Sequence, residues 1–336
     1  MGAERGGRPA VEHSLALDLS HEDACDVLVR LADGADVFVQ SLRPGLAERR
    51  GLGAEALRSR NPRLVYCSIG AFGRAGPLRE EPGYDPLMQA AAGIMSVTGE
   101  AGGPPVRVGV SLVDQTTALW ATLGILVALA ERERTGAGRA VDVSLFESAV
   151  SLVPYHLLDF LRTGTVAGRH GTAFPLIAPY EAFATADGAL MLAAGNDRLF
   201  ARLCTALELP HLPVDARFAT NPARVESRAE LRELLAQRLR QETTDTWLER
   251  LSAARVPASA INDIRGVAEH AQTRALGLLQ ALGGEELVAP PLSFDGERVQ
   301  HVSPPPAVGA DTEAILRELG YAEEEVARIA GNGPAR

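Results

Sequence analysis

One carboxylate stands alone where an apolar segment passes into a long uncharged one. Asp114 follows Val110-Ser111-Leu112-Val113, and residues 115–130 carry no charge. The pattern predicts a strand from Arg107 that leads into a long helix, with Asp114 at the junction. An aspartate where a helix begins accepts hydrogen bonds from free backbone N–H groups and lies at the positive end of the helix dipole, so it stays ionised. An ionised carboxylate can act as a nucleophile, although most residues of this kind are only helix caps.

The composition limits the chemistry that the chain can perform. Its 336 residues, 46% of them hydrophobic, are enough for one large or two ordinary domains. The formal net charge of −10 argues against a nucleic acid as partner. All 33 basic residues are arginine, which excludes Schiff-base chemistry on lysine. A phosphate group would have to be bound by arginine, helix N-termini or backbone N–H groups.

Metal binding, disulfide formation and membrane insertion are not predicted. Cys25, Cys67 and Cys204 are widely spaced and form no metal-binding pattern with histidine. The N-terminus lacks the apolar segment of a signal peptide, and no apolar run reaches the length of a membrane span without flanking charge. We therefore expect no metal cofactor, no membrane partner and a cytoplasmic location.

Strands and helices alternate in the first part of the chain. Apolar runs predict strands at residues 14–19, 36–40, 64–69 and 140–145, and helical patterns cover residues 22–32, 55–60 and 86–95. Short strand–helix–strand units build parallel sheets, in which ligands bind at the carboxyl ends of the strands. Arg43 and Arg49 follow the second strand, where they could bind an anionic ligand. A solvated surface position is the simpler role for each.

A second unit begins near residue 175. Two strand patterns, 178–185 and 189–194, flank Ala186-Asp187-Gly188 and predict a β-hairpin. Helices and one further strand follow it. We therefore predict the first part of a large α/β domain at 1–145, a linker at 146–174, a small α+β domain at 175–265, and a return linker with the C-terminal part of the large domain at 266–336.

Several short motifs occur in one order along most of the chain. They are DVFVQSLRPG at 36–45, NPRLVYCSI at 61–69, PGYD at 82–85, GPPVRVGV at 103–110, RTGAGR at 134–139, DVSL at 142–145, IAPY at 177–180, AGND at 194–197 and VP at 256–257. With these motifs the chain resembles the family III CoA-transferases, the CaiB/BaiF family. Each motif alone would be weak evidence, but their number and order are specific.

The resemblance implies a fold and a reaction. The fold would be a Rossmann-like large domain that holds both termini, with a small domain between them, in an interlocked homodimer. Asp114 would be the nucleophile that attacks an acyl-CoA thioester, giving an aspartyl–acyl anhydride and free CoA thiolate. The thiolate would return to form an aspartyl-CoA thioester, from which a carboxylic acid accepts CoA. Arg49 matches an arginine that binds CoA phosphates in relatives, and Ser41 and Leu42 match residues that line the CoA cleft.

Tyr84 bears on which reaction the chain performs. Acyl-CoA racemases of the same family have histidine at this position and aspartate at the position of Asp114, because racemisation needs two bases that work near neutral pH. A tyrosine, with an ordinary pKa of about 10, suits that role poorly. Tyr84 therefore favours CoA transfer, with its ring packed on CoA, and racemisation stays the alternative.

The acid that accepts CoA is the least determined feature. The motifs at 177–180 and 194–197 are most similar to members that use short dicarboxylic acids such as succinate. Arg107 or Arg169 would then pair with the second carboxylate of the acid. Arg107 is equally suited to a structural role in the segment before Asp114.

The chain departs from the family pattern at its N-terminus. Relatives begin with a further segment of some tens of residues that carries the first sheet strand and part of the CoA site. Without that segment, sheet edges would be exposed and CoA contacts would be lost. Three explanations stay open: a start codon assigned late, a truncated and non-catalytic copy, or a missing part supplied from elsewhere.

Overall fold

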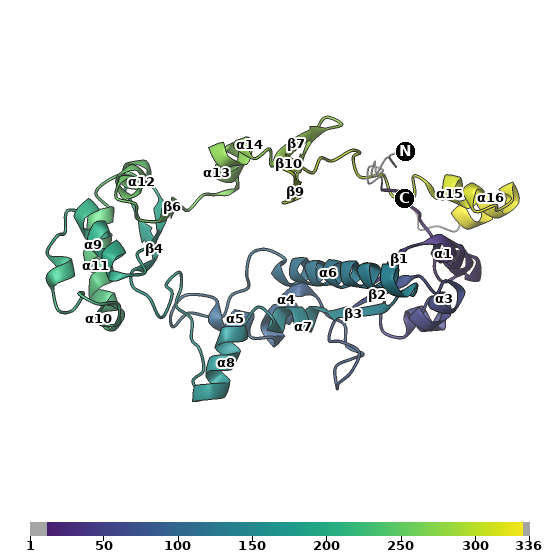
Figure 1. Ribbon diagram of the computed structural model, residues 1–336, viewed down its shortest axis with the longest axis horizontal. Coiled ribbons are helices and arrows are strands. Elements are labelled where there is room, and N and C mark those ends of the chain that lie inside the picture. The colour runs from purple at the N-terminus through teal and green to yellow at the C-terminus, as the bar shows by residue number, and fades with distance from the viewer. Residues whose placement is uncertain (1–11, 332–336) are drawn as a thin grey trace. The chain divides into compact units, whose positions relative to one another are not determined.

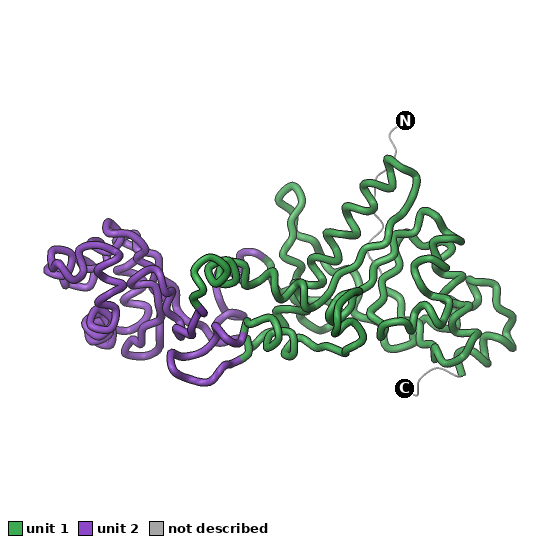
Figure 2. The backbone as a smooth tube through the Cα atoms, turned by 90° about the horizontal axis from the view of Figure 1, so that it is seen from below, with its two compact units in different colours: residues 1–94, 107–165, 277–336 green, residues 95–106, 166–276 purple. Residues whose placement is uncertain are grey.

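The computed structural model describes residues 12–331, which form two compact units. Among the described residues, the first unit comprises 12–94, 107–165 and 277–331, and the second comprises 95–106 and 166–276 (Figure 2). The chain therefore leaves the first unit twice and returns to it twice.

The first unit contains the parallel sheet. Its elements before the second unit are α1 (Glu22–Gly34), β1 (Val37–Gln40), α2 (Leu46–Arg49), α3 (Ala54–Arg60), β2 (Val65–Gly70), α4 (Asp85–Ala91), α6 (Leu112–Thr135), β3 (Ala140–Ser144), α7 (Leu145–Val150) and α8 (Pro154–Thr163). After the second unit come β7 (Leu279–Leu282), β8 (Glu285–Val288), β9 (Ser293–Phe294), β10 (Glu297–Arg298), α15 (Thr312–Glu318) and α16 (Glu323–Gly331). The helix α5 (Ile94–Val97) spans the boundary between the units.

The sheet has the strand order β1-β2-β3, with all neighbours parallel. This confirms the predicted mixed α/β class with a parallel sheet. The long helix α6 packs on β2 and β3 (Figure 1). Gly124, in the middle of α6, permits this close approach, because a Cβ at this position would lie 2.6 Å from Cγ1 of Val141 in β3. Gly138 plays the same part before β3, where a Cβ would lie 2.1 Å from the Leu64 carbonyl oxygen.

The strand predicted at residues 14–19 is wrong. The backbone of this segment bonds to the start of α15 instead of to a strand. The N–H of Ser14 donates to Asp311 Oδ2 (2.8 Å), and the N–H of Ala16 donates to Thr312 Oγ1 (3.0 Å). Side chains far along the chain thus satisfy the groups that a sheet would have used.

Some predicted helices are interrupted. The pattern at 86–95 divides into α4 and α5 at Gly93, whose φ of 85° ends the first helix. The segment after β3, in the predicted linker, forms two helices, α7 and α8, which are separated just before Pro154, a residue with no N–H to continue a helix.

The second unit is built on a three-stranded antiparallel sheet in the order β4-β5-β6. Its elements are β4 (Tyr180–Ala184), β5 (Ala189–Ala193), α9 (Asp197–Ala206), a 3₁₀ turn η1 (Leu212–Val214), α10 (Asn221–Glu226), α11 (Arg228–Leu239), α12 (Thr244–Ala253), β6 (Ala258–Ala260), α13 (Ile264–Glu269) and α14 (Ala271–Ala275). The hairpin β4–β5 around Asp187 confirms the predicted one. Its apolar face packs with α9, α11 and α12 in one core that contains Phe200 and Trp247.

Within residues 12–331, α6 is long and apolar enough to cross a membrane. An 18-residue window of it has a mean hydropathy of 1.5, and 22% of that window is buried. The expectation concerned runs without flanking charge, and the uncharged stretch of α6, residues 115–130, is shorter than this window and is bounded by Asp114 and Glu131. Helices of globular proteins pass the same test of length and composition, so this one feature is weak evidence for a span.

Candidate active site

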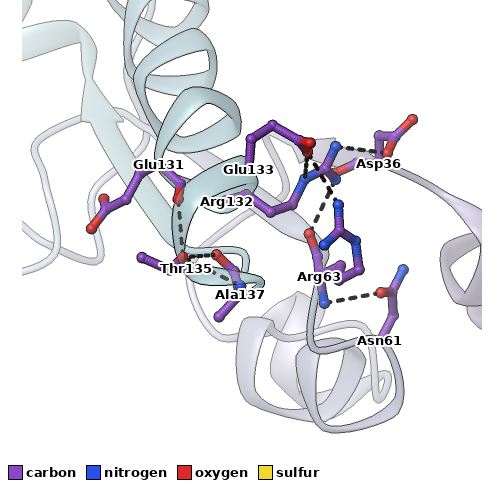
Figure 3. A network of polar contacts seen from close by, with 8 residues as sticks. All are labelled: Asp36, Asn61, Arg63, Glu131, Arg132, Glu133, Thr135 and Ala137. Carbon is purple, nitrogen blue, oxygen red and sulfur yellow. Dashed lines mark hydrogen bonds and ion pairs between the residues drawn. The ribbon is translucent and has the colours of Figure 1, made fainter.

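Asp114 lies in the first turn of α6, at the carboxyl end of the parallel sheet. The opposite end of α6 is fixed by Arg132, whose Nη2 lies 2.9 Å from Asp36 Oδ1 and whose Nη1 donates to the Arg63 carbonyl (3.2 Å), both close to where β1 and β2 begin (Figure 3). Arg63 also pairs with Glu133 (3.1 Å). The helix therefore runs antiparallel to the strands. Its N-terminal turn comes to the edge where ligands bind in such sheets.

Asp85 of α4, and not Asp114, caps α6. Asp85 Oδ2 accepts hydrogen bonds from the N–H groups of Val113 (2.7 Å) and Asp114 (3.2 Å). The predicted helix cap at Asp114 is therefore wrong, because a residue of another helix already bonds the N–H groups of the first turn. The strand predicted from Arg107 is also wrong, since residues 107–111 form neither strand nor helix.

The carboxylate of Asp114 is exposed and receives no hydrogen bond from the residues that the structure describes. Partial desolvation, together with the negative charge of Asp85, raises the pKa of Asp114 above its ordinary value. The direction is opposite to the one expected for a helix cap. A higher pKa makes the ionised carboxylate more basic, which favours its use as a nucleophile.

A cavity of about 550 Å³ opens where β1 and β2 end. It is lined by apolar groups, among them Leu42 and Phe72, and by arginines 43, 74 and 79. Arg74 Nη1 lies 3.0 Å from both carboxylate oxygens of Asp142 at β3, which ties the loop at 70–77 to the sheet. Four carboxylates, those of Glu48, Glu80, Asp142 and Glu147, also line the cavity, and Arg79 pairs with Glu80 (3.1 Å). The cavity thus combines an apolar wall with charges of both signs, and Arg43 is the lining arginine that has no ion pair among the described residues. Its charge is the one available to a phosphate group.

The predicted CoA-binding residues fall in different places around this cavity. Leu42 and Arg43 line it, and Ser41 precedes them as an exposed residue. Arg49 lies in α2, and its guanidinium is so close to Gly45 that a Cβ there would be 2.8 Å from Nη1. Tyr84 is the residue before α4 and is 72% exposed.

Neither Tyr84 nor Asp114 belongs to the described residues that line the cavity. Both lie at the N-terminal ends of helices in the first unit, and Asp85 connects them. Asp85 follows Tyr84 in the chain and bonds the backbone of Asp114.

The two arginines predicted to bind a second carboxylate differ in their surroundings. Arg107 is exposed, and its Nη1 donates to the Val108 carbonyl (3.3 Å). Arg169, in the second unit, donates twice to the Gly103 carbonyl (3.1 and 2.7 Å) and once to that of Ser96 (3.2 Å). Its guanidinium therefore holds two segments of that unit together.

The sequence reasoning did not identify Asp85, Gln89, Arg74 or Arg79. Asp85 and Gln89 are four residues apart on α4, so they share one face of the helix, and both are buried. Asp85 ends the PGYD motif and Gln89 follows it by one helical turn, so this pair of polar residues was an available signal. Arg74 and Arg79 belong to the loop region that follows β2.

A comparison with family models matches residues 12–312 to CoA-transferase family III. The chain belongs to this family. It is 37% identical to an acyl-CoA transferase of Fusarium pseudograminearum over 329 residues, 96% of this chain and 72% of the relative. It is 34% identical to a succinyl-CoA:glutarate CoA-transferase of Mus musculus over 326 residues, 95% of this chain and 75% of the relative.

Solved structures agree with this assignment. A CaiB/BaiF family protein from Brucella suis has a TM-score of 0.83 and 36% identity, and the match covers 91% of this chain and 81% of that one. The family III resemblance inferred from the motifs is confirmed. The protein is therefore an enzyme, a CoA-transferase that uses an acyl-CoA and a carboxylic acid.

Proposed function

We propose that this CoA-transferase moves CoA between short dicarboxylic acids, with Asp114 as its nucleophile. The observation that carries the proposal is the exposed carboxylate of Asp114, held at the carboxyl end of the parallel sheet by a backbone that Asp85 fixes. Such a carboxylate is free to reach a thioester carbonyl.

The reaction would proceed by exchange of acyl bonds on Asp114. One carboxylate oxygen attacks the thioester carbonyl, the C–S bond breaks, and CoA leaves as a thiolate beside an aspartyl–acyl anhydride. The thiolate attacks the aspartyl carbonyl and releases the first acid, which leaves an aspartyl-CoA thioester. The acceptor carboxylate attacks this thioester to give a second anhydride, and the released thiolate then takes the new acyl group. Each step forms one activated bond as another breaks, so no activation is lost to water.

The cavity at the ends of β1 and β2 is proposed as the CoA site. Changing Arg43 to alanine removes one positive charge from its wall, and we expect CoA to bind about tenfold more weakly, a loss of about 1.4 kcal/mol. Isothermal titration calorimetry with CoA measures this effect. Arg162→Ala, on α8, is the matched control and should leave the affinity unchanged. Equal affinities of all three proteins would contradict this assignment.

The dicarboxylate preference rests on a relative and on one arginine. The mouse relative is named for succinyl-CoA and glutarate, and succinate and glutarate are dicarboxylic acids of four and five carbons. In this chain Arg107 lies seven residues before Asp114, with only the Val108 carbonyl as a partner among the described residues. It is proposed to bind the remote carboxylate of the acid. Arg169 is already committed to backbone carbonyls, so no substrate role is proposed for it.

Incubation of the purified protein with succinyl-CoA and glutarate tests this function. Liquid chromatography should detect glutaryl-CoA and free succinate in equal amounts. In deuterated water without an acceptor acid, the acyl-CoA should keep its α-hydrogens. Exchange of the α-hydrogens without CoA transfer would instead support the racemase alternative and overturn the proposal.

The exposed apolar face of α6 is proposed to be covered by a second copy of the chain, in a homodimer. Leu119, Leu123, Leu126 and Val127 are all more than half exposed, and Leu123 and Val127 also line a groove with Val141 of β3. Patches of this kind on soluble enzymes mark protein interfaces.

The double change Leu123→Glu with Val127→Glu should convert the dimer to a monomer, because it buries two charges in the proposed interface. Sedimentation equilibrium measures the molecular mass. Arg240→Glu, at the end of α11, is the control and should stay dimeric. A dimer that persists with both glutamates would contradict this interface.

A further inference from the structure

A buried relay of side chains holds the turn that carries Asp114. Asp85 is 4% exposed and Gln89 is fully buried, one turn apart on α4. Gln89 Nε2 donates to Asp85 Oδ1 (2.6 Å), and Gln89 Oε1 accepts from the N–H of Val108 (2.8 Å). Asp85 Oδ2 accepts from the N–H groups of Val113 and Asp114. One face of α4 therefore binds the backbone on both sides of the turn between residues 108 and 113.

The donor and acceptor roles in this relay can be assigned in only one way. At one end the backbone N–H of Val108 donates, so the amide oxygen of Gln89 must point toward it. The amide nitrogen of Gln89 then has to donate to Asp85, and at the other end two more N–H groups donate to the same side chain. The side chain at position 85 thus accepts every hydrogen bond, which only a carboxylate can do with both of its oxygens.

Burial makes each of these bonds costly to lose. In a buried position an unpaired donor or acceptor loses its full hydration free energy without compensation. An amide at position 85 would direct two NH₂ groups at each other or leave a backbone N–H unpaired. The first turn of α6 would then shift to recover its hydrogen bonds, and the Asp114 side chain would move with it.

We propose that Asp85 and Gln89 are positioning residues, which aim the Asp114 carboxylate by fixing the backbone of the first turn of α6. This inference rests on the proposed role of Asp114 as the nucleophile. Asp85 touches Asp114 only through the backbone N–H, so it acts through the nucleophile and not on the substrate.

The charged groups around Asp114 let the position of the Asp85 charge be followed through the pKa of Asp114. Asp85 on α4 is the charged group that acts on Asp114, and with desolvation it raises the pKa of that carboxyl. On α7, which packs against α6, the carboxylate of Glu147 is bonded to Ser144 Oγ (2.5 Å). Arg107, before α6, donates to a carbonyl. Moving the negative charge of Asp85 away should therefore lower the pKa of Asp114.

A double-mutant cycle that moves the negative charge from position 85 to position 89 tests the relay. Asp85→Asn and Gln89→Glu should each lower kcat for CoA transfer by about 10²-fold, the effect of misplacing a reacting group by about 1 Å. In the double variant D85N/Q89E, the carboxylate at position 89 would accept from Val108 and from the new amide, whose oxygen would accept from α6. All hydrogen bonds are thus restored with the charge one turn farther away. We expect kcat within about tenfold of the native value.

A second readout separates positioning from general stability and does not need catalysis. Carbodiimide labelling of Asp114, followed by mass spectrometry of its peptide across pH, reports the pKa of this carboxyl. The double variant should give a midpoint at lower pH than the native protein, since its negative charge is farther from Asp114. If the native protein fails to transfer CoA, the proposed function fails, yet this labelling still tests the relay.

Two outcomes would overturn the positioning role. One is a double variant that folds, as circular dichroism shows, but whose kcat is no higher than that of the less active single variant. The other is a double variant that does not fold, because the relay predicts that its hydrogen bonds are complete. An unfolded single variant with a folded, active double variant would support the relay.

Discussion

Replacing Asp114 by asparagine should lower kcat for CoA transfer by about 10⁴-fold or more, the scale seen when a covalent nucleophile is removed. Asparagine keeps the shape and exposure of the side chain, and the backbone N–H of residue 114 can still donate to Asp85. The change therefore removes the nucleophilic oxygen and leaves the turn in place. Measuring the rate of glutaryl-CoA formation from succinyl-CoA gives the size of the loss.

A neighbouring residue provides the control for this variant. Gln115 is exposed and follows Asp114 in α6, so Gln115→Asn tests for unrelated effects of shortening or altering a side chain there. It should keep kcat within about twofold. Calorimetry should show that the asparagine variant at position 114 still binds CoA. Turnover by that variant within about tenfold of the native rate would mean that another group is the nucleophile.

Replacing Trp247 by alanine should destabilise the second unit by about 3–5 kcal/mol. Trp247 is fully buried in its core, and its Nε1–H donates to the Leu239 carbonyl (2.7 Å). The guanidinium groups of Arg238 and Arg250 lie 5.0 and 5.1 Å from the ring centroid. Alanine would leave a cavity, an unpaired carbonyl and two arginines without their aromatic contact.

Urea unfolding followed by circular dichroism measures this loss of free energy. Trp247→Phe is the matched control: it keeps most of the apolar volume and removes the hydrogen bond, so its cost should be about 1–2 kcal/mol. Equal costs for alanine and phenylalanine would show that the ring does not fill the core as the structure indicates.

The hairpin and the parallel sheet could be predicted because their signals are local. The turn around Asp187 and the alternation of its flanking strands lie within a few residues of each other, as do the apolar runs of β1, β2 and β3. The segment from residue 14 to residue 19 has the same apolar character. Its hydrogen-bonding partners, Asp311 and Thr312, lie almost 300 positions away, and no local pattern reveals them.

In the candidate site, too, local features could be predicted and distant partners could not. The position of Asp114 at the beginning of a long helix could be predicted, because an uncharged, largely apolar stretch follows it. The residue that caps α6 could not be predicted, because Asp85 lies 29 residues before Asp114 in the chain and reaches α6 only through the packing of α4. The direction of the pKa shift could not be predicted either. Partial desolvation and the negative charge of Asp85 raise the pKa of Asp114, whereas the expected capping bonds would have lowered it.

The substrate arginines could be judged only with the structure. Arg107 and Arg169 are equally basic in the sequence, and both stand near family motifs. In the structure the guanidinium of Arg169 donates hydrogen bonds to the carbonyls of Gly103 and Ser96, while Arg107 is exposed. Hydrogen bonds to the backbone leave no trace in sequence, which is why the two could not be distinguished there.

The central claim is that Asp114 becomes covalently activated during turnover. The most direct measurement is to mix the protein with succinyl-CoA, add hydroxylamine, and sequence the peptides by mass spectrometry. We expect an aspartyl hydroxamate at Asp114 that forms only with the acyl-CoA present and is absent from Asp114→Asn. A hydroxamate at a different carboxylate, or transfer of CoA with no trapped residue at all, would contradict it.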